Sequence, residues 1–284
     1  MLINPRAGNE WTADHWLAAD ERLHALILVA TALPEHAAAE IRRAGQDPRM
    51  VGVSLGANGL GRPFGHPVYH PIYEAAVELD LPVVIQVGSD AATDQLTKPV
   101  AGGLPSTHAE YTALGSHALA THVASLIGQG VFDLFPTLRV LLVAGGLTWI
   151  PGYLWRFDYW HHMNGRETPW LSQLPSEYFL EHVSVTTYDA ERTPTPEQLA
   201  QALGALPGLE RSLVYASGYP SATAARPADA AARLPAGWHD ALFRENAQRL
   251  FRWPGDPRTV ARREPISATA LAEPAFALSS PEGR

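Results

Sequence analysis

The sequence contains no cysteine, and lysine occurs only once, at Lys98. The lack of cysteine excludes disulfide bonds, thiolate nucleophiles, cysteine-ligated zinc and iron–sulfur clusters. Positive charge is also scarce, because 21 Lys and Arg residues stand against 29 Asp and Glu, a net charge of −8. A chain of this charge lacks the attraction to phosphate groups that nucleic acids and anionic membranes require. We therefore expect neither nucleic acid nor membrane as a partner.

Long hydrophobic runs are absent as well. No stretch of 18 apolar residues occurs, and the segment after Met1 leads into polar Gly8, Asn9 and Glu10 instead of an apolar signal region. We therefore expect a cytoplasmic protein. Hydrophobic residues make up 46% of the 284 residues and charged residues 18%, which is enough apolar material for a large core. The length fits one α/β barrel.

Metal-binding motifs are lacking although the chain has 12 histidines. Neither His-x-His nor His-Glu-x-x-His occurs, and His66 and His70 stand in a proline-containing loop. The adjacent His161 and His162 point about 100° apart on a helix. Neither pair can chelate a metal by itself. The sequence predicts no metal and no other cofactor.

Two short motifs have simple structural explanations. Gly52–Gly56 matches G-x-S-x-G, but the nucleophile elbow places its serine on a sharp turn between a strand and a helix. Ser54 is instead predicted within a strand, where it has a structural role. Gly56–Gly61 is glycine-rich like a phosphate-binding loop, yet no helix is predicted directly after it. We interpret this segment as a flexible loop.

Short apolar runs alternate with longer amphipathic segments, a pattern typical of an α/β fold with a buried parallel sheet. The predicted strands are Leu23–Ala30, Met50–Leu55, Leu81–Val87, Leu138–Ala144, His182–Thr187 and Ser212–Ser217. The predicted helices are Pro34–Ala44, Pro71–Leu79, Ser116–Phe132, Trp149–Met163, Pro196–Leu206 and Trp238–Phe251. Repeated strand–helix units at this length favour a (β/α) barrel, which six strands would leave incomplete. We predict a barrel domain over residues 1–253 and a C-terminal tail or arm over residues 254–284.

A series of motifs resembles the amidohydrolase-2 family from about residue 9 to residue 253. The matching segments, in order, include Asn9-Glu10-Trp11, Asp47-Pro48-Arg49-Met50, His70-Pro71-Ile72-Tyr73-Glu74-Ala75-Ala76, Phe135-Pro136-Thr137-Leu138-Arg139, Gly145-Gly146, Trp155-Arg156-Phe157-Asp158, Pro175-Ser176-Glu177-Tyr178 and Glu245-Asn246-Ala247. The resemblance implies a TIM barrel and the chemistry of metal-dependent hydrolases and decarboxylases. It also implies a homodimer.

The departures from the family pattern concern the metal ligands. The family opens with a strand that carries His-x-His, and the resemblance here begins after that strand. We therefore expect an open barrel whose exposed edge is covered by another segment. Gln86, Ala144, Gly218 and Ser221 stand where the family has a His, a His or Glu, an Asp and a His. These side chains are poor ligands for a catalytic divalent ion. The resemblance, with these losses, predicts a metal-free member.

Barrels of this kind bind their ligand at the C-terminal ends of the strands. The long segment from Asp90 to Tyr111 follows one predicted strand and supplies acid–base groups. We predict Asp90, His108 and Tyr219 as catalytic residues, although Asp90 could cap a turn and His108 could be simply solvent-exposed. The predicted substrate-binding residues are Gln86, Ser89, Tyr111, Trp149, Thr187, Ser217, Ser221, Arg62 and His70.

Three functions are compatible with such a site. The first is a metal-independent enzyme that acts on a hydrophobic biosynthetic metabolite through acid–base or shape-controlled chemistry, such as cyclisation, isomerisation, dehydration or decarboxylation. The second is an amide or ester hydrolase with a protein base or an unrecognised metal. The third is a non-catalytic binding or scaffold subunit. The first is the prediction that we favour.

Overall fold

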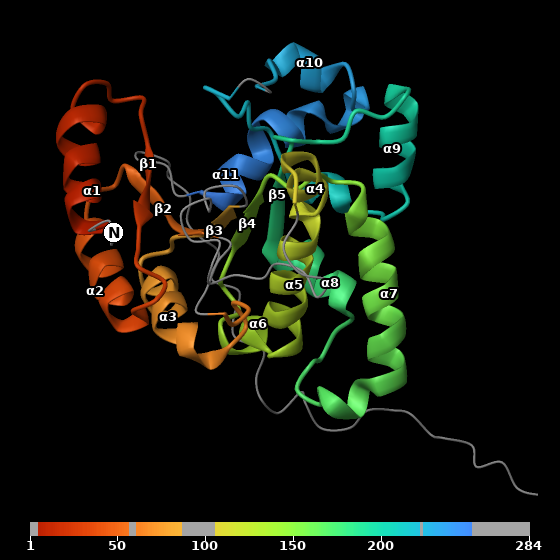
Figure 1. Cartoon of the computed structure of the whole chain (residues 1–284), viewed down its shortest axis with the longest axis horizontal. Helices are drawn as coiled ribbons and strands as arrows, with labels where there is room; N and C mark the ends of the chain where they lie inside the picture. Colours follow the sequence, from red (N-terminus) through yellow and green to blue (C-terminus); the bar gives the residue numbers. More distant parts are fainter. Residues whose placement is uncertain (1–4, 57–60, 87–105, 222–223, 252–284) are drawn as a thin grey trace, which may run out of the picture.

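The computed structural model describes residues 5–56, 61–86, 106–221 and 224–251 (Figure 1). At its centre lies a six-stranded parallel sheet whose strands follow one another in chain order. The strands are β1 (Ala25–Leu28), β2 (Met50–Gly56), β3 (Val83–Gln86), β4 (Val140–Val143), β5 (Val183–Thr186) and β6 (Leu213–Val214). All six predicted strands are confirmed, each near its expected position.

Valine residues line up across the neighbouring strands of the sheet. Val53, Val83, Val140 and Val183 lie side by side across four neighbouring strands. Such β-branched residues pack well on a pleated surface that is covered by helices. Within the described ranges no pairing joins β1 to β6, so the sheet stays open. The prediction of an incomplete α/β barrel is therefore confirmed.

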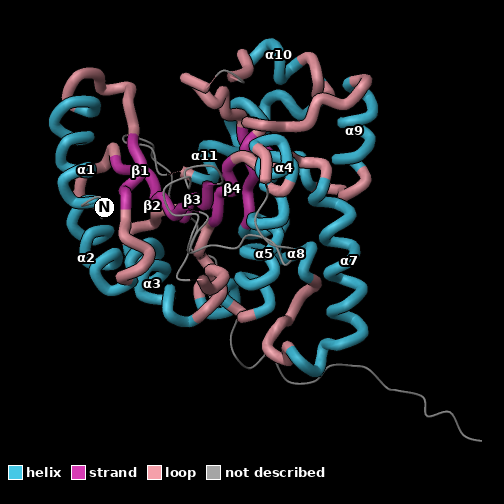
Figure 2. The backbone as a smooth tube through the Cα atoms, in the orientation of Figure 1, coloured by secondary structure: helices cyan, strands magenta, loops and turns pink. Residues whose placement is uncertain are grey.

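Helices lie around the strands (Figure 2). The α-helices are α1 (Pro5–Trp11), α2 (Pro34–Ala44), α3 (His70–Glu78), α4 (His108–Ala113), α5 (Gly115–Gly128), α6 (Val131–Leu134), α7 (Trp149–Asn164), α8 (Pro175–His182), α9 (Pro196–Gly204), α10 (Pro227–Ala231) and α11 (Asn246–Leu250). Shorter 3-10 or π turns are η1 (Thr12–Leu17), η2 (Pro67–Tyr69), η3 (Gly165–Glu167), η4 (Leu209–Ser212), η5 (Ala236–Trp238) and η6 (Ala241–Glu245).

One helix prediction needs correction. The segment Ser116–Phe132 was expected as one helix, but Gly130 adopts a left-handed backbone (φ 69°) and separates α5 from α6. The predicted helix Trp238–Phe251 is helical from His239 to Leu250, with the π turn η6 in its middle. By contrast, α2 has the predicted bounds, with a proline in its first turn and two arginines in its last turn.

The two faces of the sheet pack against different partners. Side chains alternate between the faces of a strand. Val53, Leu55 and Ile85 point outward into the main core, which the surrounding helices complete. A smaller cluster occupies the inner face and joins β3, β4 and β6 to α11; its buried members are Val84, Leu141, Val214 and Leu250. The inner face is thus packed by α11 over part of its area.

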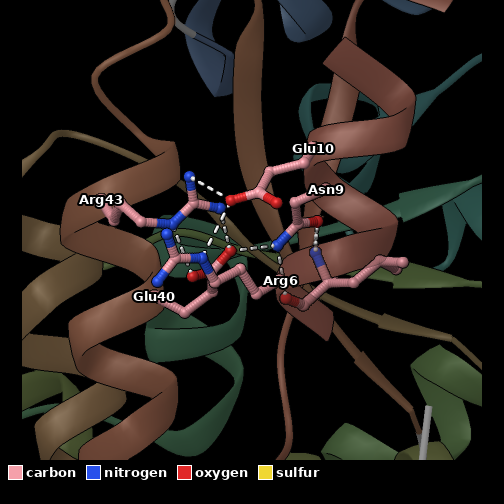
Figure 3. Close-up of polar contacts among 6 residues, drawn as sticks. Arg6, Asn9, Glu10, Glu40 and Arg43 are labelled. Carbon is pink, nitrogen blue, oxygen red and sulfur yellow. Dashed lines mark hydrogen bonds and ion pairs between the residues drawn. The ribbon is translucent and has the colours of Figure 1, made fainter. Parts of the chain in front are cut away.

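The open edge at β1 is covered by the N-terminal helix. Asn9 is only 2% exposed, and its side-chain amide exchanges two hydrogen bonds with the backbone of Leu28 (Figure 3). The Leu28 N–H donates to Asn9 Oδ1 at 2.8 Å, and Asn9 Nδ2 donates to the Leu28 carbonyl at 3.0 Å. Asn9 also donates to Glu40 at 2.8 Å, and Arg43 holds that carboxylate from the other side at 2.6 Å. The asparagine side chain therefore pairs with β1 as a neighbouring strand would.

The opposite edge at β6 is capped by a second asparagine. Asn246 is 1% exposed, and its Nδ2 donates to the carbonyl oxygens of Glu210 and Leu213 at 2.8 and 2.6 Å. Tyr215, which follows the strand, donates its N–H to the Leu242 carbonyl at 3.1 Å.

In the part of the chain that the structure describes, no helix is long and apolar enough to cross a membrane.

Candidate functional site

The C-terminal end of the inner face carries polar side chains. Ser54, Gln86 and Thr186 alternate with outward-facing core residues, so they point to the inner face. The register places Gly56, Gln86 and Val143 side by side. Ser54 and Gln86 are partly exposed, whereas the outward-facing residues next to them are fully buried. We use the term strand-end site for Ser54, Gln86, Val143 and Thr186 together with the turns that follow β4 and β6.

The turn after β4 is built from three successive left-handed residues. Ala144, Gly145 and Gly146 have φ values of 66°, 83° and 75°. Backbone N–H groups near such a run can converge on an anion. Here the anion is a carboxylate of the chain itself, because the N–H groups of Leu147 and Thr148 donate to Glu191. The loop after β5 therefore supplies the acidic group that binds this turn.

Glu191 caps the N-terminus of α7 from a distance in the sequence. It accepts hydrogen bonds from the N–H groups of Leu147 at 2.9 Å and Thr148 at 3.1 Å, and from the Thr148 hydroxyl at 2.8 Å. The first turn of α7 has no acidic residue of its own, so this carboxylate complements the helix dipole. Arg233 donates to the Glu191 carbonyl oxygen and fixes the same loop. We infer that the role of Glu191 is structural.

Asp189 differs from Glu191 in its environment. Its backbone is left-handed (φ 64°), and the residue is exposed to solvent. Partial burial of the carboxyl group raises the pKa of Asp189, the Gly145 N–H opposes that effect, and the charge of Glu191 adds to it. The net direction is upward. Asp189 therefore takes up a proton more readily than an ordinary aspartate.

The turn after β6 is closed by an aromatic ring. Gly218 has a φ of 74°, and a Cβ atom at this position would overlap Cδ2 and Cε2 of Tyr188. No side chain fits at position 218 while the Tyr188 ring occupies this space. This is the position at which the family resemblance implies a metal-ligating aspartate. The loop after β5 thus fills the space of that ligand.

The donor set does not fit a divalent metal centre. The implied ligand positions hold the neutral amide of Gln86, the methyl group of Ala144, no side chain at Gly218 and the hydroxyl of Ser221. Among the described residues, no group of three or more His, Asp or Glu side chains could hold a metal ion. A hydrolytic metal requires imidazole or carboxylate ligands. We therefore derive no chemical step through a metal.

Several predicted site residues lie together at this end of the sheet. Gln86 ends β3, and Ser217, Tyr219 and Ser221 belong to the turn after β6. The Ser217 hydroxyl accepts the Tyr219 N–H at 3.2 Å, and the Ser221 N–H donates to the Gly218 carbonyl at 2.8 Å. Tyr219 is 85% exposed. Thr187 is buried, and its hydroxyl accepts the Ala216 N–H at 3.2 Å, which ties the turns after β5 and β6 together.

Three other predicted residues lie elsewhere. Trp149 begins α7, donates to the Gly146 carbonyl at 3.2 Å and packs against the main core. Arg62 is exposed and contacts His66 at 3.3 Å. His70 packs its ring edge-to-face against Phe135, with centroids 5.4 Å apart. None of the three belongs to the strand-end site as defined above.

His70 has a buried Nε2 atom without a hydrogen-bond partner. Burial lowers the pKa of its imidazole, while Glu74 opposes this effect and His66 adds to it. A neutral ring in an aromatic environment fits a packing role for His70.

The remaining predicted residues cannot be located in the site. Ser89 and Asp90 lie outside the described residues. His108 and Tyr111 belong to α4, but their side chains are also outside the described part. Ser54 lies within β2, as expected, and not on a strand–helix turn. Sequence reasoning missed Asp189 and Glu191, for which the only signal is their position just after a strand end.

The chain belongs to the amidohydrolase family, whose sequence profile matches residues 2–253. Members of this family are enzymes that include decarboxylases and hydrolases. No curated protein sequence matches the chain.

Solved structures with the same fold include several decarboxylases. The 5-carboxyvanillate decarboxylase LigW from Sphingomonas paucimobilis is 25% identical over 88% of this chain and 72% of its own, with a TM-score of 0.65. A dihydroxybenzoic acid decarboxylase from Polaromonas sp. JS666, solved with manganese and 2-nitroresorcinol, is 19% identical over 87% of this chain and 74% of its own (TM-score 0.65).

An amidohydrolase from Mycobacterium avium subsp. paratuberculosis K-10 is also similar. It is 19% identical, with 87% of this chain and 63% of its own covered and a TM-score of 0.67. The chain thus spans less than two thirds of the length of that protein. The likeness to the structures at 19% identity supports the fold.

Proposed function

We propose that this protein is a metal-independent enzyme that acts on a hydrophobic organic substrate by acid–base or shape-controlled chemistry. Cyclisation, isomerisation, dehydration and decarboxylation belong to this class. The observation that carries the proposal is the closure of position 218 by the Tyr188 ring. A site that excludes the family's acidic ligand, with an amide and a methyl group at two further ligand positions, has to perform its chemistry with protein groups.

Decarboxylation of an aromatic acid is the member of this class that we favour. LigW, the neighbour with 25% identity, is named as a decarboxylase of 5-carboxyvanillate. Neutral Gln86 and Thr186 can hydrogen-bond hydroxyl and carboxylate groups, and Tyr188 and Tyr219 offer aromatic surface at the same end of the sheet. These side chains suit a planar, hydroxylated substrate.

The predicted site residues enter this function as proposals. We assign proton transfer to Asp90, His108 and Tyr219. Contacts to the substrate are assigned to Gln86, Ser89, Tyr111, Trp149, Thr187, Ser217, Ser221, Arg62 and His70. Among these, the packing of Trp149 and His70 against the main core favours Gln86, Ser217 and Ser221 as the direct contacts.

The test is turnover of a panel of aromatic acids by protein prepared in the presence of a chelator. The panel contains 5-carboxyvanillate and 2,6-dihydroxybenzoate, and products are separated by liquid chromatography. We expect turnover that is unchanged by EDTA and not increased by added manganese. Turnover that requires manganese would contradict the proposal, as would release of amide or ester cleavage products alone.

The assembly and location of the protein are further proposals. We propose a homodimer, on the family resemblance alone, and a cytoplasmic location. Light scattering of the purified full chain tests the first, and a mass close to 30.8 kDa would contradict it. Fractionation of cells that express the untagged chain tests the second.

A further inference from the structure

We propose that the exposed face of α7 is the surface through which two copies of this chain form a homodimer. This inference rests on the homodimer proposed above, and it names the surface and the geometry of the contact. α7 lies at the margin of the molecule in Figure 1. Its exposed residues include a series at intervals of three and four positions, which is the spacing of one helix face. We call this series the α7 stripe: Gly152, Trp155, Arg156, Tyr159, Trp160 and Met163.

The inner face of the same helix is already packed. Ile150 and Leu154 are buried. Trp149, Tyr153 and Phe157 pack against the main core, and their rings contact one another in series with centroids 5.4 and 6.1 Å apart. A helix that is hydrophobic on all sides is normally buried on all sides. The single chain buries only one side of α7, so its aromatic outer side calls for a partner.

The α7 stripe has the size and composition of an interface centre. Trp155, Tyr159, Trp160 and Met163 are 46% to 59% exposed. A fully exposed side chain of this size presents about 200 Å², so the four together present about 400 Å². This is roughly half of the area, about 800 Å², that each partner buries in a stable interface. Trp, Tyr, Met and Arg are also the residue types that are enriched in interfaces.

The order of residues along the stripe identifies a second copy as the partner. A two-fold interface brings the same surface of both copies together, so that surface must be complementary to itself. In an antiparallel pair of helices, residues equally distant from the two-fold axis stand at the same level. The stripe has such a midpoint between Phe157 and Asp158. About this midpoint, Gly152 pairs with Met163, Trp155 with Trp160 and Arg156 with Tyr159.

Two of these pairs are complementary in shape or charge. A Cβ atom added at Gly152 would meet no atom within 4 Å outside the local helix backbone, so the space beside this glycine is open. Met163 of the second copy would fill that space, and methionine adapts to irregular gaps. The exposed guanidinium of Arg156 would lie against the ring of Tyr159 of the second copy, whose negative face attracts a cation. An unrelated partner would not require this match of the stripe with its own reverse.

The first test is the mass of the full chain in solution, measured by analytical ultracentrifugation over a range of concentrations. We expect a wild-type mass close to twice the chain mass of 30.8 kDa. Trp155→Glu places a charge in the interface and should raise the dissociation constant of the dimer about 100-fold or more. The matched control is Trp16→Glu, at a tryptophan on η1 that is 56% exposed, against 51% for Trp155. The control should remain dimeric.

A monomeric wild type overturns the proposal and leaves the α7 stripe to another occupant, such as residues 252–284 or a membrane surface. A Trp155→Glu variant that stays as dimeric as the wild type also overturns it, although the homodimer itself would then stand. Equal weakening by Trp16→Glu has the same consequence. None of these results bears on the metal-independent chemistry, which turnover in EDTA tests separately.

The second test detects the pairing of the two helices and needs no disruptive variant. The chain has no cysteine, so introduced thiols are the only ones present. An equilibrated mixture of Gly152→Cys and Met163→Cys chains, treated with a short dimaleimide reagent, should yield a covalently linked dimer. Each variant alone should yield little, because the two copies of either position stand about 16 Å apart along the helix axis. Linking in the single variants and none in the mixture overturns the two-fold pairing.

Discussion

The turns that follow β4 and β6 stand at the same end of the sheet and are filled in different ways. The turn after β4 presents backbone N–H groups, and the carboxylate of Glu191 accepts hydrogen bonds from them. The turn after β6 presents the bare backbone of Gly218, and the ring of Tyr188 covers it. One side of the strand-end site is therefore charged and hydrogen-bonded, and the other is aromatic.

One loop supplies both the carboxylate at the first turn and the aromatic ring at the second. Tyr188, Asp189 and Glu191 lie within the five residues after β5, and Thr187 joins this loop to the turn after β6 through Ala216. A metal would link several strand ends through its ligands. In this chain, hydrogen bonds and ring packing from a single loop link them instead. We therefore expect that separate substitutions can disrupt the carboxylate contacts at the turn after β4 and the ring contact at the turn after β6.

The largest effect is expected from Gly218→Asp, which restores the acid of the family pattern. The new Cβ would overlap the Tyr188 ring, and a left-handed backbone is unfavourable for a side chain. We expect a loss of about 3 kcal/mol in the free energy of unfolding, measured by urea denaturation. In a Tyr188→Ala background the overlap disappears, and the cost should fall to about 1 kcal/mol. Equal costs in the two backgrounds would contradict the steric explanation.

The second largest effect on stability is expected at Glu191, on the charged side of the strand-end site. Glu191→Ala removes the acceptor for two amides and one hydroxyl at the N-terminus of α7. We expect a loss of about 2 kcal/mol in unfolding free energy. Glu191→Gln keeps one acceptor oxygen and should lose less. The matched control is Glu167→Ala, a change at an exposed glutamate. A similar loss in this control would argue against capping by Glu191.

The third prediction is a pH dependence with a defined sign. Because the pKa of Asp189 is raised in the folded protein, its favourable contribution is complete below the unfolded pKa and is lost as pH rises through the folded pKa. The Asp189→Asn variant should therefore gain stability relative to the wild type as pH rises from about 3.5 to 7.

Asp229 provides the opposite case for that pH series. Hydrogen bonds from Arg226 lower the pKa of Asp229, so its contribution is present above the unfolded pKa and is lost as pH falls through the folded pKa. The Asp229→Asn variant should therefore lose stability relative to wild type as pH rises. Urea denaturation of both variants across this range measures the two slopes. Slopes of the same sign would be inconsistent with the different environments of the two carboxyl groups.

The smallest effect on stability is expected from Tyr219→Phe. The side chain is 85% exposed, so the free energy of unfolding should change by less than about 0.5 kcal/mol. If Tyr219 takes part in proton transfer, turnover of the aromatic acid should nevertheless fall. Unchanged turnover together with unchanged stability would remove Tyr219 from the proposed catalytic residues.

The strands of the sheet could be predicted from the sequence because each strand has a local hydrophobic pattern. Runs such as Val83-Val84-Ile85 are apolar at every position, which is typical of a parallel strand with both faces buried, and the prolines at Pro34 and Pro196 mark helix starts. The split between α5 and α6 was missed because the apolar pattern continues across Gly130. Backbone conformation, and not hydrophobicity, separates these helices.

Only part of the candidate site could be predicted from the sequence. Gln86, Ser217 and Ser221 could be identified because they follow strands directly. The contact of Tyr188 with Gly218 joins residues 30 positions apart and has no local pattern. The same holds for Glu191, which caps a helix that begins 42 residues earlier in the chain. Packing of the turns against one another decides these contacts, so local sequence patterns do not reveal them.

The pairing of Asn9 with Leu28 makes the edge of the sheet sensitive to chemical ageing. Hydrolysis of that one amide to a carboxylic acid would keep the shape of the side chain but remove both of its N–H donors. The new carboxylate would face the Leu28 carbonyl oxygen and the Glu40 carboxylate, which now receive those hydrogens. Repulsion there would push the N-terminal helix off β1 and leave a strand edge that a second chain can extend into an aggregate. The cover of the β1 edge therefore depends on the side-chain nitrogen of Asn9.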